Sequence, residues 1–382
     1  MNIILTDLDA HLTFAPLTLT RPIGNLRMGR FTNDERWRRW LPESRVSFHT
    51  EDFLKALFPI QKSEDNYWVN ACVIPTKKLI DELVKLSSNE ALYYKNTLLV
   101  YRGEELERSP SKKISFEDEL VLIENRWDLF KRNNEVLEQD FKELMDEDLS
   151  SASLPDDCTL IGSHDKLFIH PYAEVCCSTF NTTAGPIYID ENAEVMEGCL
   201  IRGGLYLGKK SALKMGTKIY GASSFGPHSK IGGEVNNCIF QGYSNKGHDG
   251  FLGNSLIGEW CNIGADTNTS NLKNNYGKVK TYCYHEKQMI QTNEQFMGVT
   301  MGDHAKTGIN TMLNTAAVVG VFATIFGSGL PPKYVPEFSW GGFTDEKYEF
   351  DKALLVARNM MERRGVELTN DMTALLKKLY KG

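Results

Sequence analysis

The stretch from Ser244 to Asn271, SNKGHDGFLGNSLIGEWCNIGADTNTSN, holds the residue types best suited to chemistry in this chain. Its one histidine, His248, carries an imidazole that titrates near neutral pH, so it could take a proton from a nucleophile. The alternative is a solvated or capping loop residue, which is how we interpret the other seven histidines: His11, His49, His164, His170, His228, His285 and His304.

Arginines are dense in a second stretch, TRPIGNLRMGRFTNDERW, from Thr20 to Trp37. Because a guanidinium binds phosphate through two parallel hydrogen bonds, this cluster could form a phosphate site. The other interpretation is a solvated or salt-bridged surface. Of its members, Arg21 and Arg27 are the candidate phosphate ligands.

Composition narrows the class of protein. The 382 residues are 41% hydrophobic and 24% charged, with a net charge of -7, which is typical of a folded globular chain. The acidic balance argues against a general nucleic-acid or anionic-membrane binder. The longest apolar run, Ala316–Ala323, is far short of the roughly 18 to 20 residues of a membrane span. With no secretion signal visible, we expect a cytoplasmic protein.

Eight cysteines are present, and no pair has the two-residue gap of a zinc or redox motif. A disulfide framework is typical of short secreted chains. Reduced, buried thiols are therefore expected.

A repeat of six residues defines the element that must position His248. The fourth residue after each large apolar residue of the repeat is mostly small. The large apolar residues at this spacing are Ile189, Val195, Ile201, Leu207, Leu213, Ile219, Phe225 and Ile231. Such hexads predict a parallel β-helix, in which three short strands form each triangular coil and the large side chains fill the interior.

The repeat is interrupted at about 236–254 and about 268–296. Interruptions of a solenoid commonly form loops on one face that build a binding site. We therefore expect two loops here, the second of them polar.

The flanking segments have a different pattern. Residues 1–150 predict a mixed α/β domain, with strands near 3–5, 67–74, 98–101 and 120–123, helices near 79–86 and 127–144, and a linker near 143–153. The β-helix would occupy 155–335. A helical tail, 344–382, would contain two amphipathic helices with Thr344 and Thr369 as N-caps.

The pattern G-H-x-x-[YF]-L-G-x-x-x-I-G-x-x-x-N-I-G-A, which begins at Gly247, closely resembles the acetyltransferase half of the bifunctional enzymes that make UDP-N-acetylglucosamine. Those enzymes acetylate glucosamine 1-phosphate and then uridylylate the product. The resemblance covers about 155–335. It implies a left-handed coil and a homotrimer with acetyl-CoA bound between neighbouring prisms.

The resemblance also implies roles for individual residues. His248 falls on the general base, and Ala265 lies at a position beside acetyl-CoA. The contacts to the sugar phosphate would come from five matched positions: Lys218, Phe251, Asn262, Asn271 and Lys278. Of these, Phe251 lacks the hydroxyl group of the usual tyrosine, and Lys218 stands near a position that is usually arginine. For Asn262 and Asn271 a structural ladder of stacked amides at the coil corners remains the alternative.

Near the N-terminus, PLTLTRP (16–22) resembles the start of sugar-1-phosphate nucleotidyltransferases. The glycine-rich phosphate loop and the lysine of that family are replaced here, and the Gly-Asp that holds Mg²⁺ corresponds roughly to Asn70-Ala71. The opening TRP-x-x-x-L-R-x-G, together with the GYSNKGHDGFLG loop, is identified as that of a divergent Bacteroides-type form of the bifunctional family.

The resemblance therefore implies acetyl transfer from acetyl-CoA to glucosamine 1-phosphate, coupled to uridylyl transfer from UTP with Mg²⁺ if the N-terminal domain is active. Two alternatives remain open. One is a sugar-1-phosphate nucleotidyltransferase, such as a glucose-1-phosphate thymidylyltransferase-like enzyme, whose β-helix is structural. The other is a non-catalytic trimeric scaffold that binds sugar nucleotides.

Overall fold

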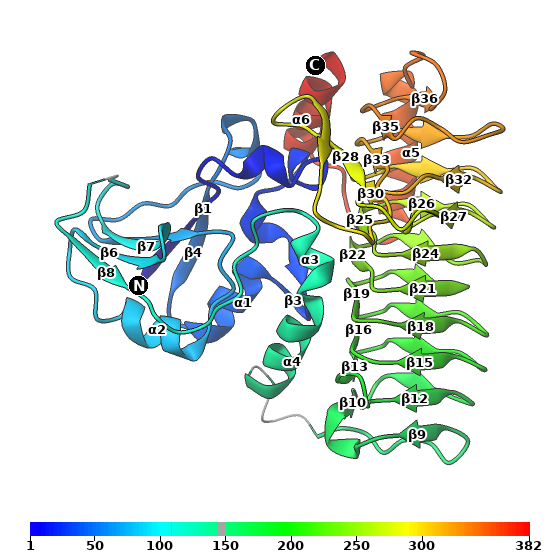
Figure 1. Cartoon of the computed structure of the whole chain (residues 1–382), viewed down its shortest axis with the longest axis horizontal. Helices are drawn as coiled ribbons and strands as arrows, with labels where there is room; N and C mark the ends of the chain where they lie inside the picture. The colour runs from blue at the N-terminus through cyan, green and yellow to red at the C-terminus, as the bar shows by residue number, and fades with distance from the viewer. Residues whose placement is uncertain (108, 144, 146–149) are drawn as a thin grey trace.

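A computed structural model describes residues 1–107, 109–143, 145 and 150–382 of the chain. An α/β domain, a β-helix and two C-terminal helices follow one another along the sequence, and the α/β domain lies against one side of the stacked coils (Figure 1). The expected fold class is confirmed. The predicted linker falls partly on residues 144 and 146–149, which lie outside the described residues.

The N-terminal domain is built on one mixed sheet. Neighbouring strands are parallel in the β4-β1-β5 part and between β6 and β8, and antiparallel on both sides of β7. In spatial order the strands are β4 (Arg45–His49), β1 (Asn2–Thr6), β5 (Asn66–Asn70), β7 (Thr97–Gly103), β6 (Glu90–Tyr94) and β8 (Lys112–Ser115).

Among the described residues, beside short 3-10 turns, four α-helices and a short hairpin complete this domain. They are β2 (Arg27–Met28), β3 (Phe31–Thr32), α1 (Asn33–Trp40), α2 (Lys77–Leu83), α3 (Asp128–Lys131) and α4 (Asn133–Glu143). The strand expected near 120–123 is wrong: this segment makes only an isolated bridge between Val73 and Leu122. Thr76 caps the start of α2, where its side chain accepts a hydrogen bond from the amide of Leu79.

Three parallel sheets form the sides of the β-helix. The first contains β10 (Leu167–Ile169), β13 (Ile187–Ile189), β16 (Leu205–Leu207), β19 (Ser223–Phe225), β22 (Ile239–Gly242), β25 (Leu256–Glu259), β30 (Thr300–Met301), β33 (Val318–Val319) and β35 (Tyr334–Val335). The second contains β11 (Glu174–Val175), β14 (Glu194–Val195), β17 (Ala212–Leu213), β20 (Lys230–Ile231), β23 (Asn245–Lys246), β26 (Asn262–Ile263), β31 (Lys306–Thr307), β34 (Thr324–Ile325) and β36 (Trp340–Gly341). The third contains β9 (Thr159–Ile161), β12 (Thr179–Asn181), β15 (Leu200–Arg202), β18 (Lys218–Tyr220), β21 (Glu234–Asn236) and β24 (Phe251–Gly253).

The hexad residues fill the interior of these coils, as predicted. All eight of them, from Ile189 to Ile231, are at most 2% exposed, so each coil buries its apolar side chains only by stacking on its neighbours. The eight cysteines are free thiols, and five are buried. The expectation of burial is wrong for Cys177, which is exposed, and for two half-buried cysteines.

The first interruption of the repeat is not a loop, contrary to expectation. The coils continue through β22, β23 and β24 in parallel register. Ile231 pairs with Lys246, 15 positions later, whereas Leu213 pairs with Ile231, 18 positions later. The interruption is therefore a shortened coil, in which Lys246 takes the inward position.

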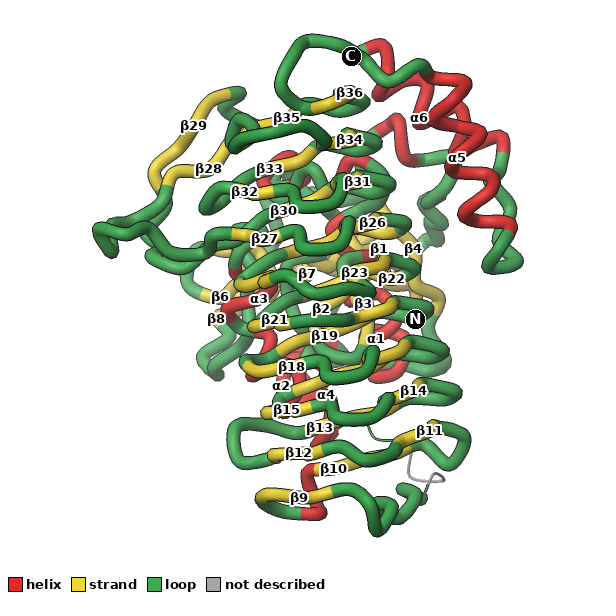
Figure 2. The backbone as a smooth tube through the Cα atoms, turned by 90° about the vertical axis from the view of Figure 1, so that its right-hand side faces the viewer, coloured by secondary structure: helices red, strands yellow, loops and turns green. Residues whose placement is uncertain are grey.

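The second interruption leaves the coils after β27 (Asn268–Thr269), whose strand partner β32 (Met312–Leu313) lies in the following coil. It forms an antiparallel hairpin of β28 (Lys280–Cys283) and β29 (Gln288–Gln291), which projects from the stack (Figure 2). Arg126 of the N-terminal domain donates hydrogen bonds to the Thr281 hydroxyl and the Tyr282 carbonyl. The predicted polar loop thus contacts the N-terminal domain.

The first sheet of the β-helix faces the N-terminal domain. Ile239 and Leu256 belong to the same apolar cluster as the core of that domain. On the lower coils, Leu137 of α4 packs on Tyr188 and Tyr206. The first sheet therefore forms the apolar contact with the N-terminal domain.

The tail forms α5 (Phe350–Glu362) and α6 (Asn370–Lys381), which pack beside the upper coils (Figure 2). Thr369 caps α6 by accepting from the amide of Met372, as predicted. The predicted cap Thr344 is wrong, because α5 begins after Glu349. In the described ranges, no helix has the length and apolar character needed to cross a membrane.

Candidate functional site

His248 and Ala265 line one groove of about 430 Å³ at the corner between the second and third sheets. Both come from consecutive coils, since β23 pairs with β26 just before each residue. The His248 side chain is exposed to solvent. The structure therefore brings together the predicted base and the predicted acetyl-CoA contact. The other side chains that line the groove are Met196, Lys214, Met215, Asp249 and Asp266.

Glycines keep this corner open. Gly232 and Gly247 follow the inward residue of successive coils, and a Cβ on Gly232 would lie 2.7 Å from the backbone carbon of Gly247. A Cβ on Gly247 would meet nothing within 4 Å. The wall of the groove is thus backbone where these glycines stand and side chain where Met196 and Lys214 occupy the same position on earlier coils.

Lys246 lies beneath the loop that carries His248. Its ammonium donates to the carbonyl of Gly232 at 2.9 Å and to that of His248 at 2.8 Å. The side chain is buried, and burial lowers its pKa to about 8. This lysine ties the His248 backbone to the preceding coil.

Phe251 and Lys218 lie on the third sheet rather than in the groove. Lys218 pairs with Glu234, and Glu234 pairs with Phe251, so the three stand in one column on successive strands. Lys218 lines a separate hollow of about 440 Å³ with Arg202. The structure therefore separates Lys218 from the lining of the His248 groove.

The two predicted asparagines occupy different places. Asn262 is exposed on the second sheet, where it pairs with Asn245. Asn271 donates to the side-chain oxygen of Asn254 at 2.7 Å. That contact between side-chain amides is the one that the ladder interpretation predicts, and it involves the Nδ2 group of Asn271.

Lys278 is exposed at the base of the excursion that ends in the β28-β29 hairpin. Its ammonium donates to the side-chain oxygen of Asn293 at 3.0 Å. It shares with Asn271 the segment that leaves the coils after β27.

Arg21 contacts carboxylates of the β-helix. Its guanidinium lies 2.7 Å from Asp303 and 3.0 Å from Glu259. Burial alone would lower the pKa of Arg21, but the two carboxylates raise it above its usual value. The salt-bridge interpretation is therefore favoured over phosphate binding for Arg21, whose role is to fix one domain on the other.

Arg27 lines a cleft of about 360 Å³ between the N-terminal domain and the β-helix. Its side chain donates to the carbonyls of Arg30 and Gln241. The cations in the lining of the cleft are Arg27, Arg30, Arg38, Arg39 and Lys209, and the carboxylates are Glu35 and Asp190. Phe31, Tyr188 and Tyr206 add aromatic rings to the lining. Three of the cations form ion pairs, Arg27 with Glu35, Arg38 with Asp34 and Lys209 with Glu191. The lining still contains more cations than carboxylates, as a site for a phosphorylated ligand requires.

The strand end at which the resembling family holds Mg²⁺ carries Asn70 and Ala71 here, as the sequence indicated, and does not fit that ion. Asn70, at the end of β5, donates to the Leu98 carbonyl and accepts from the Cys72 amide. The neighbouring acid Asp7 already accepts from His11, Thr50 and the Ile23 amide. In the described part of the chain, no group of three or more histidine, cysteine or acidic side chains could hold a metal ion.

Sequence reasoning missed Lys214, Asp266 and the buried Lys246. A signal for two of them is present in the hexad spacing. Lys214 directly follows the inward Leu213, at the corner position that Gly232 occupies one coil later. Lys246 is a charged residue at an inward position, which the shortened coil concealed.

Residues 3–148 match the sugar nucleotidyl transferase family. The chain is 29% identical over 144 residues to the bifunctional sugar-1-phosphate nucleotidylyltransferase/acetyltransferase of Sulfurisphaera tokodaii, a match that covers 37% of this chain and 35% of that protein. It is 37% identical over 73 residues to the bifunctional protein GlmU of Methanocaldococcus jannaschii, which covers 19% and 17% of the two chains. The matched region spans about a third of the first relative and about a sixth of the second.

The N-terminal domain is thus nucleotidyltransferase-like in sequence, and the chain resembles bifunctional transferases at low identity.

Proposed function

We propose that the β-helix transfers acetyl from acetyl-CoA to the 2-amino group of glucosamine 1-phosphate. The observation that carries the proposal is that His248, from the GHDGFLG segment, and Ala265, from the next coil, line one groove. The similarity to a nucleotidylyltransferase/acetyltransferase supports the same reaction class.

The chemistry requires a base. A sugar ammonium must lose one proton before its nitrogen can attack, and His248 takes a proton from the amine as the new N–C bond forms at the thioester carbonyl. Backbone N–H groups of the groove stabilise the oxyanion of the tetrahedral intermediate. The C–S bond then breaks, and the thiolate of coenzyme A receives a proton from the His248 imidazolium.

The sugar and its phosphate would be held by Phe251, Asn262, Asn271 and Lys278, with Ala265 beside the acetyl donor. Phe251 lies on the third sheet, beyond the lining of the groove, so its apolar ring, which has no hydroxyl group, would contact only a ligand that extends past the corner. Lys218 faces another hollow, so its contact with this substrate requires a ligand that extends across the third sheet or a site completed by another copy.

The test is the release of coenzyme A thiol from acetyl-CoA plus glucosamine 1-phosphate, for the wild type and His248→Ala. We expect turnover in the wild type and a loss of about 10² to 10⁴-fold in the variant. Retained folding is checked by circular dichroism, with exposed His285→Ala as the matched control. Wild-type turnover that survives His248→Ala would refute the role of the imidazole, and no turnover at all would favour the structural β-helix or scaffold alternatives.

We further propose that the N-terminal domain uridylylates N-acetylglucosamine 1-phosphate with UTP, and that Arg27 contacts the phosphates in the interdomain cleft. The match of residues 3–148 and the cationic lining support this step. Pyrophosphate release is measured with saturating UTP and added Mg²⁺. Release with glucose 1-phosphate and dTTP instead would support the thymidylyltransferase-like alternative.

The proposed enzyme is a cytoplasmic homotrimer of the divergent Bacteroides-type form. The open groove beside His248 supports an arrangement in which a neighbouring prism closes the acetyl-CoA site.

A further inference from the structure

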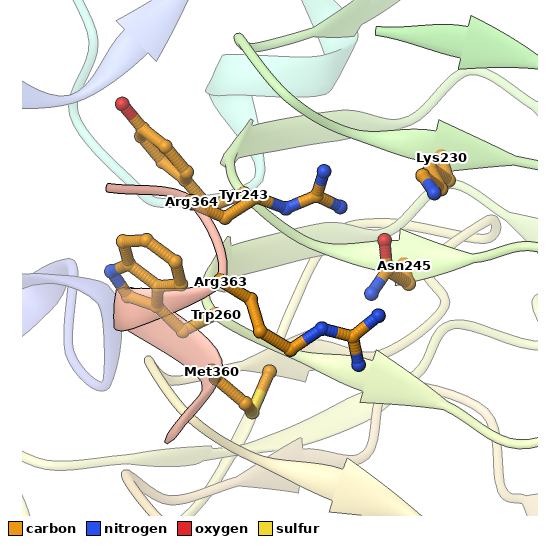
Figure 3. A pocket seen from close by; sticks show the side chains of 7 residues that line it. All are labelled: Lys230, Tyr243, Asn245, Trp260, Met360, Arg363 and Arg364. Atoms are coloured by element: carbon orange, nitrogen blue, oxygen red, sulfur yellow. The ribbon is translucent and has the colours of Figure 1, made fainter. Parts of the chain in front are cut away.

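The end of α5 closes another pocket, of about 150 Å³, over the second sheet of the β-helix. Arg363 and Arg364 directly follow the helix, and their guanidinium groups point towards the strands that carry Lys230 and Asn245 (Figure 3). The full lining is Lys230, Tyr243, Asn245, Trp260, Met360, Arg363 and Arg364. It contains no residue proposed above for acetyl or uridylyl transfer.

Three cations converge here without a carboxylate in the lining. Within the ranges that the structure describes, none of the side chains of Lys230, Arg363 and Arg364 forms an ion pair or a hydrogen bond. Cations at a helix C-terminus are common because they complement the helix dipole. That explanation covers the two arginines but not Lys230, which comes from β20.

The electrostatic effect of this convergence reaches the neighbouring groups. Burial and the positive charges of Arg364, Lys214 and Arg363 lower the pKa of Lys230, whereas Glu194, two strands away, acts in the opposite direction. Burial and Arg364 likewise lower the pKa of His228. Glu259 acts on Tyr243 in the direction opposite to Arg364, so nearby carboxylates offset part of the positive potential, while the lining itself carries cations and no carboxylate.

The size and walls of the pocket limit what it could hold. Tyr243 and Trp260 are stacked on each other with ring centroids 4.3 Å apart, and His228 stacks on the other face of Tyr243. The faces of the tyrosine ring are thus already covered, which leaves no place for a nucleobase between these rings. At about 30 Å³ per water molecule, the volume of 150 Å³ corresponds to about five waters, which suits a phosphate group.

We propose that this pocket is an anion site for a phosphate group, held by Lys230 of β20 and by Arg363 and Arg364 after α5. Guanidinium groups bind phosphate oxygens through paired hydrogen bonds, and an ammonium adds a point charge. The phosphate belongs either to free inorganic phosphate or to a phosphate monoester whose remainder lies outside the pocket.

Binding here would couple the tail to the coils of the His248 groove. Asn245 lies on β23, three residues before His248, whereas the arginines follow α5. A phosphate that bridges Lys230 and the arginines therefore fixes the end of α5 on this coil. The inference is independent of the proposed acetyl transfer.

The test measures binding to the full-length protein by titration calorimetry, with inorganic phosphate and with adenosine 3′,5′-bisphosphate at constant ionic strength. The variants are the double substitution Arg363→Gln/Arg364→Gln and, on the other wall, Lys230→Gln. Arg358→Gln, an exposed arginine of the same helix, is the matched control. We expect at least tenfold weaker binding in the double variant and in Lys230→Gln, and wild-type binding in the control.

The two probes distinguish the source of the phosphate. Equal affinity for both supports a site for free phosphate, and tighter binding of the bisphosphate that depends on the arginines supports a monoester. Binding that is unchanged in the double variant and in Lys230→Gln, or the absence of binding of either probe to the wild type, would overturn the proposal. Because the readout is binding, failure of acetyl transfer does not affect it.

Discussion

Lys246 shows how one residue connects the interior of the β-helix to the candidate base. The inward neighbour of Lys246 on the preceding coil is Ile231, and such interior positions normally exclude charge because desolvation of an ammonium is costly. Two carbonyl groups offset part of that cost, one of them that of His248. The pKa of Lys246, lowered to about 8, records the part that is not offset.

The lowered pKa predicts a pH dependence of stability. Below pH 8, Lys246 is protonated in both the folded and the unfolded chain, so the folded state bears the full cost of burying the ammonium. Between about 8 and the unfolded value of about 10.4, the unfolded chain binds more protons and the stability of the folded state rises with pH. We expect the stability of the wild type relative to Lys246→Met to increase by up to about 3 kcal/mol over this window.

Urea unfolding of the two proteins at pH 7 and pH 10 measures this difference. Lys306, which is also buried with its pKa lowered to about 8, remains in both proteins, so its contribution cancels. A difference in stability that does not change with pH would contradict the assignment.

Among the elements, the contact between β30 and the N-terminal domain depends on Asp303. One carboxylate oxygen accepts from the Thr20 hydroxyl and from Arg21, each at 2.7 Å, and the other accepts from the Glu259 amide. Asp303 is 3% exposed. The β-helix and the N-terminal domain are therefore joined by a buried ion pair as well as by apolar packing.

We expect Asp303→Ala to lower the free energy of unfolding by about 3 to 5 kcal/mol, because it leaves Arg21 buried with a weaker partner. Guanidinium chloride unfolding measures the loss, and the fluorescence of the tryptophans in both domains shows whether they still unfold together. Asp156→Ala, which removes an exposed carboxylate, is the control and should have no effect.

Gly247, in the groove, and Gly250, three residues further on, give a matched pair of substitutions. Gly247→Ala adds a methyl in open space, so we expect a stability change within about 0.5 kcal/mol together with a several-fold higher KM for acetyl-CoA. Gly250→Ala introduces a Cβ 2.3 Å from the Thr267 carbonyl at a φ of +111°. It should destabilise the fold by more than about 1 kcal/mol.

Steady-state kinetics and thermal unfolding of both variants check this pair. A Gly247→Ala protein with an unchanged KM for acetyl-CoA would place the acetyl donor elsewhere.

On the scale of the whole molecule, the three sheets of the β-helix have different surroundings. The N-terminal domain covers the first sheet, and α5 approaches the second. The third sheet presents an outer face with half-exposed and exposed side chains such as Phe251 and Tyr220.

A trimer in which neighbouring prisms meet beside the His248 groove predicts a mass of three times 43.2 kDa. Sedimentation equilibrium tests this, and a monomer that still releases coenzyme A would contradict a shared site.

The sequence by itself determined the β-helix, because a six-residue period of large apolar side chains can be buried only by stacking coils, as Ile189 to Ile231 show. The sequence also identified the segment that carries His248, because the residues of that motif are close together in the chain. It failed at Thr344, where a cap candidate precedes α5 by several residues, because many polar residues satisfy the cap pattern without forming the helix.

Only the tertiary structure decided which distant side chains meet. Arg21 and Asp303 are 282 residues apart, and no spacing rule relates them, so the pairing that gives Arg21 a structural role was not readable from the sequence. The same holds for Lys230 with Arg363 and Arg364, which converge because α5 packs on the β-helix. Long-range electrostatics depends on distances that the packing of whole domains sets, whereas the hexad pattern depends only on neighbouring coils.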